Sequence, residues 1–185
     1  MPRLPVLNKR DLVSPEVQPV FDAIMENRGA VTTPVGLLMH APETARHAAN
    51  LGAYLRFESG LSNDIFELAV ITAAREFDCE FVWAAHAETA IREGVPQELV
   101  DAIGVRGDVE AFPSRYRTVA QFTREMVNVH RVSQATLEAV RAEFGERGLT
   151  DITALVGFYL MLACTLFANA MELPAGRAGF PPPTK

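Results

Sequence analysis

The hydrophobic and polar positions along this chain follow a helical period almost throughout. Apolar residues recur every three or four positions, and the runs end at Gly, Pro, Ser or Asp, which are common at helix boundaries. No segment alternates convincingly between apolar and polar residues, as a half-buried strand would. We therefore predict an all-α fold. The pattern predicts helices over residues 17–25, 42–60, 62–75, 78–93, 96–103, 116–129, 136–144 and 152–171.

The last of these segments, 152–171, carries no charged residue and is about as long as a helix that crosses a bilayer. Polar and small residues interrupt it, and acidic residues, Asp151 and Glu172, flank it on both sides without a basic partner. A helix that is apolar all round is also expected at the centre of a bundle or across a subunit interface. We predict a buried helix and no membrane association.

Composition narrows the class of protein. The chain has 185 residues, of which 49% are hydrophobic, and this suits one compact domain, residues 1–173, followed by an irregular Pro/Gly-rich tail, residues 174–185. Its 17 basic and 23 acidic residues give a net charge of −6, and no basic run could neutralise a line of phosphates, so no nucleic acid is expected as a partner. Two distant cysteines make no disulfide framework and the start of the chain resembles no signal peptide, so we expect a cytoplasmic protein.

The candidate chemistry lies around residues 67–86. Cys79 and His86 are seven residues apart on one predicted helix, so their side chains share a face at a separation of about 10 Å along the axis. Glu67 could reach them only if the helix breaks near Glu76 to Asp78, with Asp78 as the N-cap of the second helix. A buried carboxylate bonded to one imidazole nitrogen would then leave the other free to move a proton.

Two opposing influences act on the pKa of the Cys79 thiol in this prediction. A position near a helix N-terminus favours the thiolate, because unpaired backbone N–H groups point at the sulfur. The neighbouring charges of Asp78 and Glu80 oppose it, since like charge raises the pKa of a thiol.

Each of these residues also has a purely structural interpretation. Glu67 follows Asp64 by three residues, which is the spacing of a capping box at a helix start. Cys79, taken alone, is typical of a small buried apolar residue, and Trp83 is typical of a side chain that packs in the core. The remaining histidines and the second cysteine lack companions at metal-ligand spacing, so we predict no metal and no cofactor. They are His40, His47, His130 and Cys164.

The run from Glu67 to Cys79, together with Trp83 and His86, resembles the carboxymuconolactone decarboxylase and alkylhydroperoxidase D-like superfamily. Segments 34–42, 51–57 and 153–159 are similar to a single-cysteine branch of it. The resemblance implies an alkylhydroperoxidase D-like helical fold that assembles as a homo-oligomer, a trimer or higher.

Peroxidase members of this superfamily carry two cysteines three residues apart, followed by a histidine four residues later and preceded by a glutamate. Glu67, Cys79 and His86 match three of these positions, but Val82 stands where the second cysteine would be. Without that thiol a sulfenic acid at Cys79 would need an external thiol reductant. Cys164 could replace it only if the fold brings the two cysteines close.

Three functional hypotheses follow. The first is acid–base chemistry, a decarboxylation or related lyase or hydrolase step, on a small carboxylated or lactone-like metabolite, with Glu67 orienting His86 and Cys79 nearby. The second is a single-cysteine alkylhydroperoxidase, a peroxiredoxin-type antioxidant activity that uses Cys79 and an external thiol. The third is a non-catalytic oligomeric binding protein.

The first hypothesis needs a pocket for its substrate. An anionic substrate could be held by Arg75 or Arg56, because a guanidinium binds a carboxylate through two parallel hydrogen bonds. The residues that we expect to line this pocket are Trp83, Val82 and Arg75.

Overall fold

The structure of the protein, a computed structural model, describes residues 2–182. Within these residues every regular element is helical, which confirms the predicted all-α class. The elements are η1 (Arg10–Leu12), α1 (Gln18–Arg28), α2 (Thr33–Leu38), α3 (Pro42–Phe57), α4 (Asn63–Glu76), α5 (Glu80–Arg92), α6 (Gln97–Gly104), α7 (Ser114–Arg124), the π-helical turn η2 (Glu125–Val129) and α8 (Gln134–Ala168).

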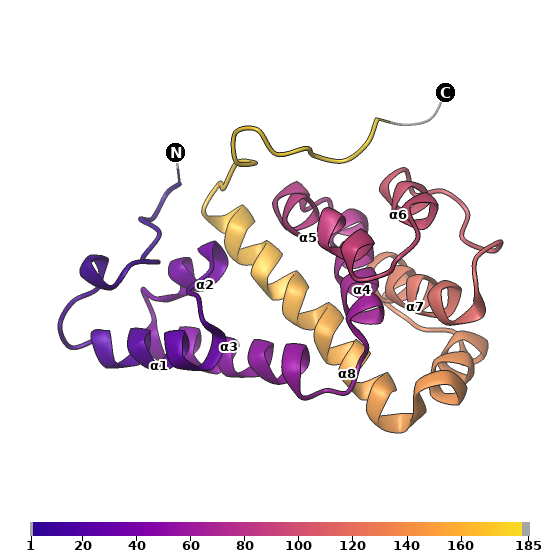
Figure 1. The fold of residues 1–185 in the computed structure, drawn as a ribbon, viewed down its shortest axis with the longest axis horizontal. Coiled ribbons are helices and arrows are strands. Elements are labelled where there is room, and N and C mark those ends of the chain that lie inside the picture. Colours follow the sequence, from indigo (N-terminus) through magenta and orange to yellow (C-terminus); the bar gives the residue numbers. More distant parts are fainter. Residues whose placement is uncertain (1, 183–185) are drawn as a thin grey trace.

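The helices pack around α4 and α8. Helix α4 contacts α5, α6, α7 and α8, and nearly all of its residues are buried, which is why its sequence reads as apolar on every face. Helices α1, α2 and α3 form a group on one side of α8, and α6 and α7 lie on the other (Figure 1). The N-terminal group therefore meets the rest of the fold along α8, next to α5.

The turn between α4 and α5 lets these two helices fold back on one another. Helix α4 ends at Glu76 and α5 begins at Glu80, as the predicted break requires. The prediction that Asp78 caps α5 is wrong, because Cys79 occupies the N-cap position. Asp78 adopts a left-handed backbone conformation, with φ of 54°, which aspartate tolerates better than most residues. Its carboxylate instead accepts hydrogen bonds from Arg75 (2.9 Å) and Arg106 (2.8 Å).

Helix α8 joins the two last predicted helices. Gly145, with φ of 70° and ψ of −179°, breaks the helical geometry between them. The helix is long and apolar enough to span a membrane by length and composition, but 50% of its most apolar stretch is buried inside the fold. It packs against α2, α3, α4 and α7, as the core-helix interpretation predicts.

Helix α2 and the C-terminal segment are the two parts of the chain that the predicted helices do not cover as the structure has them. Helix α2 was not predicted from periodicity, because it is a single short turn and a half that begins with Pro34 in its first turn. Helix α8 ends at Ala168, before the predicted end at residue 171, and segment 171–182 has no regular structure. Residues 183–185 of the predicted tail lie outside the described residues. Phe180 nevertheless packs on Trp83, with ring centroids 5.6 Å apart.

A buried carboxylate holds the end of α4 to the C-terminal half of the fold. Glu76 accepts hydrogen bonds from Arg106 Nε (3.1 Å), Arg124 Nε (3.1 Å) and Asn128 Nδ2 (3.0 Å). These three donors come from the segment after α6, from α7 and from η2. The charge of Glu76 is thus compensated on three sides, and the α4–α5 turn beside it is fixed.

Replacing this carboxylate should destabilise the fold. We expect Glu76→Ala to lower the free energy of unfolding by about 2 kcal/mol, because two partly buried guanidinium groups lose their partner. Chemical denaturation followed by circular dichroism measures the change. Glu110→Ala, which removes an exposed partner of Arg117, is the matched control and should leave stability almost unchanged. Equal effects of the two variants would show that the Glu76 cluster contributes no more than a surface ion pair.

Candidate active site

The site is built around Glu67, whose carboxylate is completely buried. Its Oε1 accepts a hydrogen bond from Arg56 Nη1 (2.6 Å), and its Oε2 lies 2.7 Å from His86 Nδ1. These three side chains come from α4, α3 and α5 respectively. The structure therefore brings Glu67 and His86 together, as the break after Glu76 predicted.

The interpretation of Glu67 as part of a capping box is wrong. Asp64 accepts hydrogen bonds from the Ser62 hydroxyl and from the N–H of Ile65, at the start of α4. Glu67 points the other way, to Arg56 and His86. Its position is thus used for a buried ionic cluster between helices.

Hydrogen bonding keeps Glu67 charged despite its burial. Burial acts to raise the pKa of Glu67, but the hydrogen bond from His86 and the charges of His86 and Arg56 together outweigh it. The pKa therefore lies below its ordinary value of 4.5, and the carboxylate is ionised at neutral pH. An ionised Glu67 accepts a hydrogen bond from the N–H group at Nδ1, which fixes the imidazole tautomer and leaves Nε2 as the basic nitrogen.

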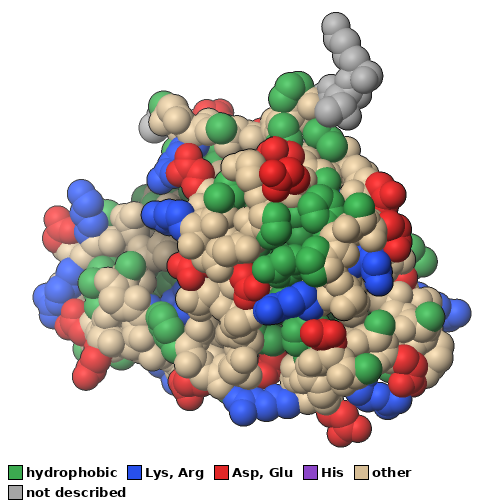
Figure 2. Space-filling model, turned by 45° about the vertical axis from the view of Figure 1, so that its right-hand side comes forward, with side chains coloured by type: hydrophobic (Ala, Val, Ile, Leu, Met, Phe, Trp, Pro, Cys, Tyr) green, Lys and Arg blue, Asp and Glu red, His purple; other side chains and the backbone are tan. Residues whose placement is uncertain are grey.

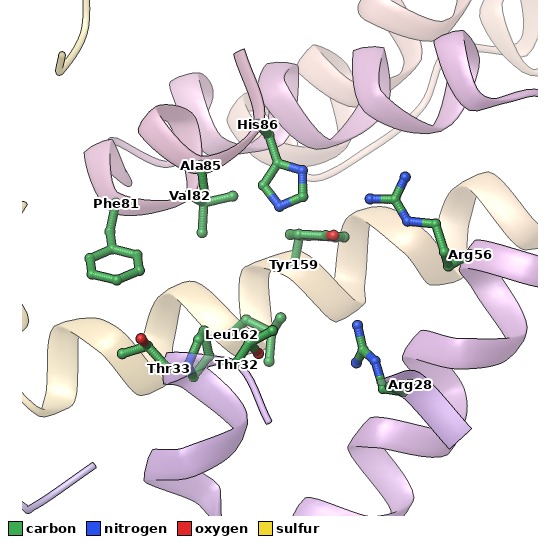
Figure 3. A pocket seen from close by; sticks show the side chains of 11 residues that line it. Arg28, Thr32, Thr33, Arg56, Phe81, Val82, Ala85, His86, Tyr159 and Leu162 are labelled. Atoms are coloured by element: carbon green, nitrogen blue, oxygen red, sulfur yellow. The ribbon is translucent and has the colours of Figure 1, made fainter. Parts of the chain in front are cut away.

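His86 lines a cavity of about 420 Å³ that lies between α5, α8 and the N-terminal helices (Figure 3). Nε2 of His86 has no hydrogen-bond partner within residues 2–182. The size is at the lower end of the range for small-molecule sites, and most of the walls are apolar. The lining residues are Arg28, Thr32, Thr33, Pro34, Arg56, Phe81, Val82, Ala85, His86, Tyr159 and Leu162.

Tyr159 and Arg28 are among the lining residues that were not predicted from the sequence. Tyr159 meets the His86 ring edge-on, with centroids 5.2 Å apart, and burial raises its pKa far above the usual value of 10. Its hydroxyl therefore keeps its proton. A phenol inside an uncharged helix needs a polar partner, and this could have pointed to Tyr159. Arg28 sits in the last turn of α1 and carries no such local signal.

Cys79 is not part of this cavity. It is 1% exposed at the N-terminus of α5, beside a separate surface hollow of about 290 Å³. Phe81 borders both spaces. The thiol therefore does not line the cavity that His86 lines.

Burial also decides the state of the Cys79 thiol. It raises the pKa of Cys79, and the N–H groups of Val82 and Phe81 lower that pKa by less. The negative charge of Asp78, which the sequence suggested as the opposing influence, is compensated by two arginines. The thiol is therefore protonated at neutral pH, contrary to the thiolate that a helix N-terminus alone would favour.

Of the three residues expected to line the substrate pocket, one does so and two face elsewhere. Val82 lines the cavity, but Trp83 and Arg75 do not. Arg75 donates to the carbonyl of Gly104 (2.6 Å), and its guanidinium lies 4.3 Å from the Phe180 ring. Trp83 is 4% exposed and packs against the same ring. Arg75 thus joins α4 to α6, and both side chains contact the C-terminal segment through Phe180.

No cluster of three or more His, Cys, Asp or Glu side chains with metal-binding geometry occurs within residues 2–182. The donor set of the candidate site, one carboxylate and one imidazole that are bonded to each other, is an acid–base pair.

The model of the carboxymuconolactone decarboxylase family matches residues 42–129, which include Glu67, Cys79 and His86. No curated protein matches the sequence. Among solved structures, a protein of unknown function from Agrobacterium tumefaciens, described as a candidate antioxidant defence protein AhpD, is 16% identical, with a TM-score of 0.66 over 75% of this chain and 95% of its own.

The debrominase Bmp8 is similar over nearly the whole chain. Its apo structure is 14% identical, with a TM-score of 0.71 and 92% of each chain covered. A variant of Bmp8 with a cysteine replaced by alanine, in complex with 2,3,4-tribromopyrrole, is 13% identical, with a TM-score of 0.72 and 95% of each chain covered. At this level of identity the likeness concerns the fold.

Residues 42–129 match the carboxymuconolactone decarboxylase family, and the fold of the chain is similar to that of AhpD-like proteins. Family and neighbours together indicate an enzyme, without fixing its reaction.

The ion cluster at Glu67 makes stability depend on pH. Because the folded-state pKa of Glu67 is lowered, its contribution is complete above the ordinary value of 4.5 and is lost as the pH falls through the folded value. We expect Glu67→Gln to be less stable than the wild type by about 2 kcal/mol at neutral pH, with a difference that shrinks below pH 4.5. Urea denaturation across this pH range measures it. The exposed Glu88→Gln is the control, and a constant difference at all pH values would contradict the prediction.

Proposed function

We propose that this protein is an enzyme that carries out acid–base chemistry on a small carboxylated or lactone-like metabolite, with His86 as the group that moves the proton. The observation that carries this proposal is the bond between His86 Nδ1 and the buried, ionised Glu67, which leaves Nε2 of His86 facing a closed-in cavity. A carboxylate in this place orients the ring and stabilises the imidazolium that forms when Nε2 takes a proton.

The reaction that we favour is a decarboxylation or a related lyase or hydrolase step. In a decarboxylation the bond to the departing carbon dioxide leaves an electron pair on carbon, and the imidazolium of His86 can deliver the proton that this carbon needs. In a lactone opening, neutral His86 takes a proton from the attacking water and returns it to the leaving oxygen. The protonated Tyr159 beside His86 can donate a hydrogen bond to a developing oxyanion in either case.

The second candidate is a peroxidase that uses Cys79 with an external thiol. Cys164 lies near enough to Cys79 for its charge to raise the Cys79 pKa, and the Agrobacterium neighbour is described as a candidate antioxidant defence protein. The buried, protonated thiol, which does not line the cavity of His86, favours the acid–base reaction instead.

The third candidate is a binding protein without catalysis. An inaccessible Cys79 agrees with it, but Glu67 is not committed to helix capping. The ionised Glu67 paired with a cavity-facing imidazole favours catalysis over simple binding. We place this activity in the cytoplasm, where free thiols such as Cys79 and Cys164 stay reduced.

Substitutions separate the two enzymatic candidates. Turnover is first sought with small lactones and carboxylic acids, and in parallel with an organic hydroperoxide and excess dithiol. We expect His86→Ala to reduce acid–base turnover at least about a hundredfold, because the proton carrier is lost, and Cys79→Ser to leave it almost unchanged. Hydroperoxide consumption that disappears in Cys79→Ser would establish the thiol mechanism. Full turnover of the acid substrates by His86→Ala would remove the proposed site.

We also propose that the protein forms a homo-oligomer, a trimer or higher. Large apolar side chains on α8 remain exposed, among them Met161 (37%) and Phe167 (46%), and Cys164 is exposed between them. A second copy of the chain would cover this uncharged surface.

Light scattering after size-exclusion chromatography tests the assembly. We expect a mass of three or more chains for the wild type and a shift to the monomer for Met161→Glu combined with Phe167→Glu, since a buried interface would gain two unpaired charges. Leu12→Glu, at an exposed apolar residue far from α8 in the sequence, is the control. A monomeric wild type would refute this assembly.

A further inference from the structure

Arg28 places a cationic group in the cavity without an anionic partner. Its side chain comes from the last turn of α1, outside the segment that the family model matches. Nη1 of Arg28 is fully buried and has no hydrogen-bond partner within residues 2–182. No carboxylate of these residues forms an ion pair with Arg28; the two guanidiniums of Arg28 and Arg56 both line the same cavity. Burial lowers the pKa of Arg28, and the charge of Arg56 lowers it further.

Helix α3 has a space for this guanidinium. A Cβ atom at Gly52 would lie 2.5 Å from Arg28 Nη1 and 2.8 Å from Phe158 Cζ, so the absence of a side chain at Gly52 lets the guanidinium rest on the helix. Glycine inside a helix is unfavourable by about 1 kcal/mol relative to alanine. The position of Arg28 is thus fixed by packing, although it makes no ion pair.

The charges of the cavity leave room for one anion. Arg28 and Arg56 each carry a positive charge, and Glu67 supplies one negative charge that both Arg56 and His86 already use. Tyr159 stays neutral. A buried positive charge without a partner destabilises a protein, so a ligand that supplies the missing negative charge would gain what the fold leaves unsatisfied.

We propose that Arg28 anchors a carboxylate group of the substrate. This inference rests on the proposed function in that the ligand is the substrate of the same cavity, and it makes that substrate a carboxylate anion. A guanidinium matches a carboxylate through two parallel hydrogen bonds, so Arg28 fixes the orientation of the ligand as well as its charge. Figure 3 shows Arg28 on α1 and His86 on α5, with Tyr159 between them. The carboxylate lies against Arg28, and the remainder of the ligand extends along the apolar wall formed by Val82 and Leu162 toward His86.

The test uses benzoate and its neutral isostere benzamide as probes, since both fit a cavity of this size and differ in the charged group alone. NMR titration of the purified protein gives the two dissociation constants. We expect wild-type protein to bind benzoate at least about tenfold more tightly than benzamide, and Arg28→Gln to abolish this preference. Gly52→Ala should reduce the preference as well, because its methyl group displaces the guanidinium while Arg28 itself remains. Arg46→Gln, which changes an exposed arginine on α3, should keep it.

Thermal melting separates an anchor from a structural arginine. Arg28→Met removes a partly buried, unpaired charge, so an anchor predicts a melting temperature equal to or above that of the wild type. Equal binding of the two probes to the wild type, or binding of neither, would overturn the proposal. A preference for benzoate that survives in Arg28→Gln would also overturn it.

His86→Ala keeps the tests of anchor and reaction apart. We expect it to retain the benzoate preference, since it leaves Arg28 in place. If the preference depends on Arg28 while His86→Ala keeps full turnover, the anchor stands and the proposed reaction fails. If His86 is essential for turnover but Arg28→Gln binds both probes as the wild type does, the reaction stands and the anchor fails.

Discussion

The buried carboxylate of Glu67 is the constraint on which the rest of the structure depends. A charge taken out of water must be compensated, and Glu67 meets this need with a guanidinium from α3 and an imidazole from α5. The same contacts that compensate the charge therefore hold three helices in register. They also give His86 its tautomer, so that fold stability and the orientation of the imidazole rest on one group.

The turn after Glu76 makes this cluster possible. Asp78, in the left-handed conformation, lies in the turn where the chain reverses between α4 and α5, and this reversal brings Glu67 to His86. Glu76 and its three donors secure the end of α4, while Arg75 secures the turn itself through Gly104 and Asp78. These contacts fix α4 and α5 relative to one another. The N-terminal helices pack against α8 and complete the cavity beside α5. On the outer face that Figure 2 shows, apolar and charged side chains are mixed.

The sequence predicted the fold and the centre of the site well, because both rest on short-range patterns. Periodicity located most helices, and the spacing of Glu67, Asp78 and His86 required a fold-back that the structure has. Residues that act through tertiary contacts were harder to predict. Whether Trp83 and Arg75 face the cavity or α6 depends on the rotation of α4 and α5, which a spacing does not determine. Arg28 enters from a helix almost forty residues upstream of Glu67, and only the packing at Gly52 shows where its side chain ends.

The position of Val82 on the cavity wall bears on how this fold could gain or lose a catalytic nucleophile. It lies on the cavity wall one helical turn before His86, whereas Cys79 does not line that wall. A thiol at position 82 would stand beside an imidazole that is already oriented, and would need no change in the backbone. Val82 has no reactive group of its own, but it occupies the position that matters for this change. Exchange of this one residue for a cysteine of similar size would place a nucleophile beside the Glu67–His86 pair, and the reverse exchange would remove it.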